Sequence, residues 1–190
     1  LVYVREGEKL GLTVQAETEV ESVERGDIVK VHATSKGQKK SYQAKNVVLS
    51  GGAFGTTKIM YQSGFKSQLP ALGKYFSMHP QFMFFGIYDE EVNAHKGMFQ
   101  SVASKDPRFR ARGFKLENVY AGPVSTSMLF HASGRDHQEL MKKYRYMTCA
   151  EVAIRDENAG EISVDNKGHL NITKSFTDQD KSRMKDGTSV

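Results

Sequence analysis

The chain has 190 residues, of which 38% are hydrophobic and 26% are charged, a composition typical of a soluble globular protein with a modest core. No apolar run approaches the roughly 20 residues that a membrane-spanning helix needs. The only cysteine, Cys149, excludes an internal disulfide and a cysteine-rich zinc site. The N-terminal residues show no secretory signal. These features do not fix a compartment, but they favour the cytoplasm.

The first part of the chain has the pattern of a three-stranded antiparallel meander. Residues 18–24, 28–33 and 42–45 read as short strands, and Val29, Val31 and Ala33 alternate onto one face. The segments between them contain glycine, which tight reversals need.

Residues 46–49 differ, because Val47, Val48 and Leu49 are adjacent apolar residues. Such a run predicts a strand covered on both faces, as in a parallel sheet. Paired glycines and a short helical pattern follow, an order by which α/β proteins bring backbone close to a ligand. A tight turn without a ligand explains the glycines as well. The G-x-G-x-x-G dinucleotide fingerprint is absent from the whole chain.

Residues 105–115 hold five basic residues against one acidic residue, Asp106. Because Phe109 and Phe114 lie within the run, a nucleic-acid contact is one interpretation. The favoured one is a solvated loop that opens at Pro107 and closes at Gly113, since one short run neutralises few phosphates.

The second half alternates further strands and helices. Residues 82–88 form an apolar strand candidate, and residues 146–154 form another. Asp136 and Glu139 are spaced as a helix cap. Residues 162–164 and 170–172 predict a hairpin around the Asp165–Gly168 turn. A polar helix is expected from Thr177 to Gly187.

Self-contained catalytic and metal motifs are missing. There is no G-x-S-x-G elbow, no phosphate-binding P-loop and no H-E-x-x-H pair. The six histidines are scattered, and Cys149 lies in a predicted strand, where a buried thiol is expected. The sequence therefore predicts no catalytic residue and no metal ligand.

Three stretches nevertheless resemble the glucose–methanol–choline (GMC) oxidoreductases, flavoenzymes that oxidise alcohol groups. Residues 16–20 together with 44–49 are similar to the family's adenine-side strands. Residues 52–64 follow the family's second signature, and residues 72–80 resemble its Leu-Gly-Arg-Asn-Leu…His-Pro stretch. The tail, residues 160–187, also fits the family's late hairpin and following helix.

The resemblance implies an internal fragment of an FAD-dependent oxidoreductase that acts on CH–OH groups. Residues 1–72 would be the C-terminal part of the FAD-binding domain, and residues 73–190 part of the substrate-binding domain. Val20 matches the position whose backbone meets the adenine of FAD, and Gly52 the glycine that lets the chain pass close to the cofactor. Since the pyrophosphate-binding unit and the catalytic histidine region lie outside the fragment, it should be inactive alone and should not retain FAD.

The implied fold class is α/β to α+β. It combines part of an FAD-binding domain, an antiparallel meander plus one buried strand, with a mixed-sheet substrate domain that carries helices. The expected partner is a small-molecule alcohol, with no nucleic acid and no membrane span; the oligomeric state is open. The alternatives are a β-rich interaction domain without catalysis and a nucleic-acid-binding module built on residues 105–115.

Overall fold

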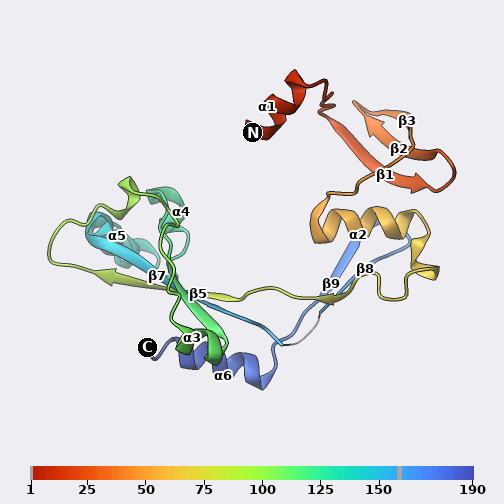
Figure 1. Ribbon diagram of the computed structural model, residues 1–190. Coiled ribbons are helices and arrows are strands. Elements are labelled where there is room, and N and C mark those ends of the chain that lie inside the picture. Colours follow the sequence, from red (N-terminus) through yellow and green to blue (C-terminus); the bar gives the residue numbers. More distant parts are fainter. Residues whose placement is uncertain (1, 158–159) are drawn as a thin grey trace. The chain divides into compact units, whose positions relative to one another are not determined.

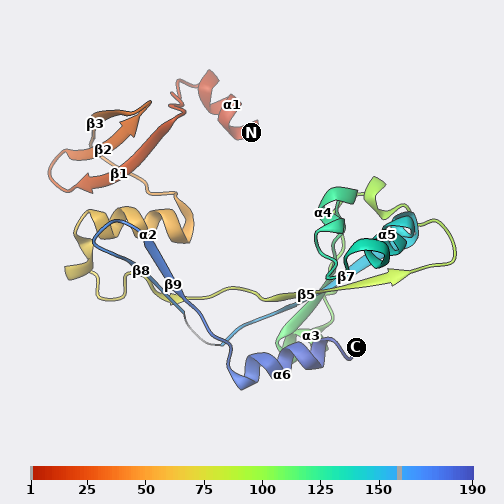
Figure 2. The same ribbon diagram turned by 180° about the vertical axis from the view of Figure 1, so that it is seen from behind.

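The computed structural model describes residues 2–157 and 160–190, which form two compact units. Residues 2–76 and 160–173 make the first unit, and residues 77–157 and 174–190 make the second. Figures 1 and 2 show the helices and strands of both units. Each unit is described by itself below.

The first unit holds two small sheets, two α-helices and a 3-10 turn. Its elements are α1 (Val2–Lys9), β1 (Thr18–Glu24), β2 (Val29–Ser35), β3 (Gln38–Ala44), α2 (Gly52–Gln62), the 3-10 turn η1 (Phe65–Ser67), β4 (Lys74–Phe76), β8 (Gly160–Val164) and β9 (Leu170–Thr173).

The predicted meander is confirmed. Strands β1, β2 and β3 pair in that order, antiparallel throughout, and Val23 pairs with Val31, which pairs with Tyr42. The register shifts between Val20 and Ser22, so β1 contains a bulge. Val23 and Ala33 are the buried apolar residues of this sheet.

The predicted buried strand at residues 46–49 is wrong. These residues belong to no strand, and Val48 is 86% exposed. An apolar run forms a doubly covered strand only where strands flank it, and among the described residues no strand pairs with this segment. The predicted helix does follow, as α2.

The second sheet of the first unit pairs its strands in the order β4-β8-β9. The predicted hairpin is confirmed, with Ile162 opposite Ile172 and Val164 opposite Leu170. Its turn is held by the Asp165 carboxylate, which accepts hydrogen bonds from the backbone N–H groups of Lys167 and His169, each at 2.8 Å. Because these hydrogen bonds join residues only two and four positions apart, the turn can be predicted from the local sequence.

The second unit holds one sheet with short helices around it. Its elements are β5 (Gln81–Ile87), η2 (Ala94–Lys96), α3 (Pro107–Arg112), β6 (Phe114–Asn118), α4 (Pro123–Ser127), α5 (Gly134–Lys142), η3 (Tyr144–Tyr146), β7 (Met147–Ile154) and α6 (Asp178–Gly187). Within the part of the chain that the structure describes, no helix is long and apolar enough to cross a membrane.

The sheet of the second unit has the order β5-β7-β6, and both pairings are antiparallel. The expectation of a mixed sheet is therefore wrong: every pairing between described strands, in both units, is antiparallel. Alternation along β7 sends Met147 and Cys149 to one face and Val152 and Ile154 to the other. Each pair is buried in its own apolar cluster, so both faces of β7 are covered.

Helix ends were predicted with mixed success. Helix α6 begins with a capping box, in which Thr177 accepts from the N–H of Asp180 and Asp180 accepts from the N–H of Thr177. The predicted cap at Asp136 is wrong, because α5 begins earlier, at Gly134, and Asp136 lies in its first turn. Ser133 takes the N-cap position with no side-chain hydrogen bond.

Candidate functional site

The turn that leads into α2 is built from backbone and contains the predicted cofactor glycine. The N–H of Gly51 donates to Oγ1 of Thr56 at 3.0 Å, and the N–H of Gly55 donates to the carbonyl of Gly51 at 3.1 Å. A Cβ at Gly51 would stand 2.9 Å from the Thr56 nitrogen. Gly51 is thus required by packing, a role that the sequence analysis did not assign.

Gly52 is required for a different reason. Its φ of +68° lies in the left-handed region that favours glycine. No atom lies within 4 Å of the place where its Cβ would stand. The backbone of Gly52 therefore faces open space, which another molecule can approach closely.

Val20 lies in β1 opposite Ala33, next to the bulge. The bulge leaves Glu21 outside the ladder register, and bulges commonly redirect backbone groups away from the ladder. Helix α2 meets β1 through other residues: Ser63 Oγ accepts from the N–H of Val23 at 2.8 Å, and Lys58 lies 3.6 Å from a Glu19 carboxylate oxygen. Since Gly52 is six residues from Lys58, about 9 Å along the helix axis, these contacts do not place Gly52 against Val20.

The second unit contains a buried carboxyl pair that the sequence analysis missed. Glu151 on β7 is 1% exposed and lies directly opposite Glu117 on β6. The two side chains share a hydrogen bond. Gln81 Nε2 donates to Glu151 Oε1, and Lys115 Nζ lies 2.8 Å from Glu117 Oε2. Only cross-strand register brings these residues together, so sequence spacing gave no signal.

The two carboxyl groups titrate in opposite directions. Burial raises the pKa of Glu151, and the neighbouring Glu117 raises it further. The hydrogen bond from Lys115 lowers the pKa of Glu117. As pH falls, Glu151 is therefore the first of the two to take up a proton, while Glu117 keeps its negative charge beside Lys115 to lower pH.

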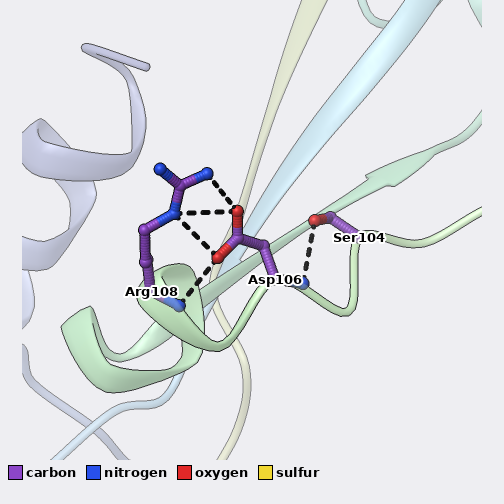
Figure 3. Close-up of polar contacts among 3 residues, drawn as sticks. All are labelled: Ser104, Asp106 and Arg108. Atoms are coloured by element: carbon purple, nitrogen blue, oxygen red, sulfur yellow. Dashed lines mark hydrogen bonds and ion pairs between the residues drawn. The ribbon is translucent and has the colours of Figure 1, made fainter.

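Residues 107–112 of the basic segment form helix α3, so the prediction of a plain loop is wrong. Figure 3 shows why the helix begins there: the Asp106 carboxylate accepts from the backbone N–H of Arg108 at 2.9 Å and from its guanidinium at 2.5 Å. The bonds from Arg108 lower the pKa of Asp106 to about 2. The predicted end at Gly113 is confirmed, since Gly113 caps the helix with a φ of +85°.

Three of the five basic side chains of this segment form ion pairs. Arg108 pairs with Asp106, Arg112 pairs with Asp186 of α6, and Lys115 pairs with Glu117. Arg110 has no ion pair among the described residues.

Comparison with known proteins finds a matching family and several related proteins. The family model described as GMC oxidoreductase matches residues 2–81. A long-chain-alcohol oxidase of Arabidopsis thaliana is 28% identical over 158 residues, covering 80% of this chain and 20% of the relative. An uncharacterized GMC-type oxidoreductase of Mycobacterium tuberculosis is 26% identical over 119 residues, covering 63% of this chain and 19% of the relative.

Over residues 2–81 the chain is similar to the GMC oxidoreductases. The chain spans about a fifth of the length of the curated relatives it matches. The matched range contains both predicted cofactor residues, Val20 and Gly52.

FAD is the cofactor that the resemblance to GMC oxidoreductases implies, and the backbone at Gly52 and Val20 is compatible with it. The open backbone at Gly52 and the bulged strand at Val20 offer main-chain groups and space, which suit close approach of a flat or extended ligand. Both residues remain predictions as cofactor contacts.

The described part of the chain shows no metal-binding cluster of histidine, cysteine or carboxylate residues. Cys149 is buried, as expected, and burial raises the pKa of its thiol to about 11. A thiol of that kind is a core residue and not a nucleophile.

The carboxyl pair leads to a pH-dependent prediction. Because the folded-state pKa of Glu151 lies above its ordinary value of 4.5, its contribution to stability is complete below pH 4.5 and is lost as pH rises through the folded-state pKa. Glu151→Gln keeps an acceptor for Gln81 and a donor for Glu117 but cannot ionise. We therefore expect its free energy of unfolding to fall less than that of the wild type as pH rises from 4.5.

Urea unfolding at several pH values measures this difference. Glu90→Gln, at an exposed glutamate of the same unit, serves as the control and should follow the wild-type pH dependence. If Glu151→Gln also follows the wild-type curve, the folded-state pKa of Glu151 is not raised.

Proposed function

We propose that the chain is part of an FAD-dependent oxidoreductase that oxidises the CH–OH group of an alcohol. The observation that carries the proposal is the match of residues 2–81 to the GMC oxidoreductase family. The long-chain-alcohol oxidase among its relatives favours a long-chain alcohol as the substrate class. FAD, when bound, would accept the hydride that leaves the alcohol carbon.

The first unit would contribute to the cofactor site through main-chain atoms. Gly52, with its positive φ and open surroundings, would let the backbone approach FAD without a side chain between them. Val20 would meet the adenine through the backbone of the bulged strand. Residues 1–72 would thus belong to the FAD-binding domain, and residues 73–190 to the substrate-binding domain.

No residue of the chain is assigned as the base that removes the hydroxyl proton. The fragment would accordingly need the rest of the protein for turnover.

Purification provides the test. The full-length parent should carry flavin absorbance and should reduce its flavin when a long-chain primary alcohol is added without oxygen. The 190-residue chain, purified the same way, should be colourless because most polar contacts to a dinucleotide lie elsewhere. A full-length protein without flavin contradicts the proposal, and a 190-residue chain with stoichiometric flavin contradicts the division of the site.

A nucleic-acid function has less support. Three of the five basic side chains in residues 105–115 are already paired with carboxylates. Fewer free cations release fewer counterions on binding, so the affinity for phosphate backbones is smaller.

A further inference from the structure

A cavity in the second unit lies at the end of the β5-β7-β6 sheet. It has a volume of about 550 Å³, and its ionisable side chains come from four segments of this unit: His79, Arg110, Lys115, Arg155 and Asp156. Met78, 44% exposed, adds an apolar group to its wall. The volume is within the range of small-molecule sites.

The acidic group of this wall is already engaged. Asp156 pairs with Lys174 at 2.5 Å, and its side chain is only 3% exposed. Asp156 Oδ2 also accepts from the backbone N–H of Met78 at 3.1 Å. Asp156 therefore does not neutralise another cation of the cavity.

The charge of Lys115 is also balanced. Its ammonium group lies 2.8 Å from a carboxylate oxygen of Glu117. Arg110 and Arg155 are different: both are exposed, and neither forms an ion pair among the described residues. Two guanidinium groups thus line one cavity without a carboxylate to compensate them.

We propose that this cavity binds an oxyanion group, a carboxylate or a phosphate, through Arg110 and Arg155. Guanidinium groups present planar sets of N–H donors that match the oxygens of both groups. Two uncompensated cations at one concave surface also attract an anion more strongly than scattered surface charges do. The proposal is independent of FAD and of alcohol oxidation.

Calorimetric titration with inorganic phosphate tests the site, at two ionic strengths. We expect one phosphate per chain and weaker binding at higher salt. Arg110→Gln and Arg155→Gln should each weaken binding by about tenfold, the usual effect of losing a charge-assisted hydrogen bond. Arg135→Gln removes an exposed arginine of the same unit that does not line the cavity, so its binding should stay within about twofold of wild type.

Octanoate distinguishes the two sources of the anionic group. If octanoate displaces phosphate and binds more tightly, the ligand is a carboxylate with an apolar tail that contacts Met78. If phosphate binds and octanoate does not displace it, the ligand is a phosphate compound. Thermal unfolding of each variant verifies that it is folded, and if one arginine variant is unfolded, the other decides.

Two results would overturn the proposal. One is phosphate binding that is unchanged in both cavity variants. The other is an equal loss in Arg135→Gln, which would mean that phosphate responds only to the net charge of the protein.

Discussion

Gly73→Ala is expected to lower the free energy of unfolding by more than about 3 kcal/mol, as for other substitutions that force a side chain into a packed backbone. Gly73 has a φ of +78°, and a Cβ there would overlap the carbonyl oxygen of Ile162. The carbonyl of Gly73 also accepts from the N–H of Ile162 at 2.7 Å. The clash therefore falls on the hydrogen-bonded contact between the β4 and β8 segments.

Gly37→Ala is a matched control for this substitution. Gly37 also has a φ of +78°, but no atom lies within 4 Å of its Cβ position. Its substitution should cost only the backbone strain, about 1 kcal/mol. Urea unfolding measures both variants, and equal costs would show that β8 moves away from Gly73 without penalty.

Gly52→Val should reduce the flavin content of the full-length parent by more than about tenfold, if the backbone of Gly52 contacts the cofactor as proposed. The branched side chain would fill the open space beside Gly52, where no protein atom lies within 4 Å. The same side chain at Gly37 meets similar strain in equally open surroundings, at a position that is not proposed to contact the cofactor. Flavin absorbance per protein and thermal unfolding of the cofactor-free forms separate binding from stability.

Gly113 is unsuitable as the control for Gly52. A Cβ at Gly113 would overlap the guanidinium group of Arg183, so its substitution would destabilise the second unit by itself. If Gly52→Val and Gly37→Val retain flavin equally, Gly52 is a structural turn glycine and its assignment to the cofactor site is wrong.

The elements that were predicted correctly from the sequence are those whose stabilising contacts join residues close together in the chain. The meander, the hairpin at Asp165 and the capping box at Thr177 depend on residues a few positions apart. The strand predicted at residues 46–49 failed because its apolar side chains have no neighbouring strand among the described residues, and Val48 is consequently exposed.

The same reasoning explains what was missed in the second unit. Glu117 and Glu151 are far apart in sequence and meet only through the register of β6 and β7. Arg112 finds its partner, Asp186, on α6. The basic segment therefore read as uniformly charged, whereas the structure separates its paired cations from Arg110.

The resemblance to the GMC oxidoreductases pointed to positions that local sequence patterns did not mark, but it gave no physical reason for them. It singled out the Leu72-Gly73 step as a family motif, and the structure explains the glycine by its contact with Ile162. It likewise pointed to Gly52, for which the structure provides the positive φ. Family motifs thus mark positions whose constraint is tertiary.

The order of the chain through the two units has a consequence for synthesis on the ribosome. Strand β4 ends at Phe76, but its partner β8 begins only at Gly160. The strands β5, β6 and β7 of the second unit all emerge in between. The nascent chain can therefore complete the three-stranded sheet of the second unit before the partner of β4 has been synthesised. The β4-β8-β9 sheet of the first unit can form only after residue 173 has left the exit tunnel.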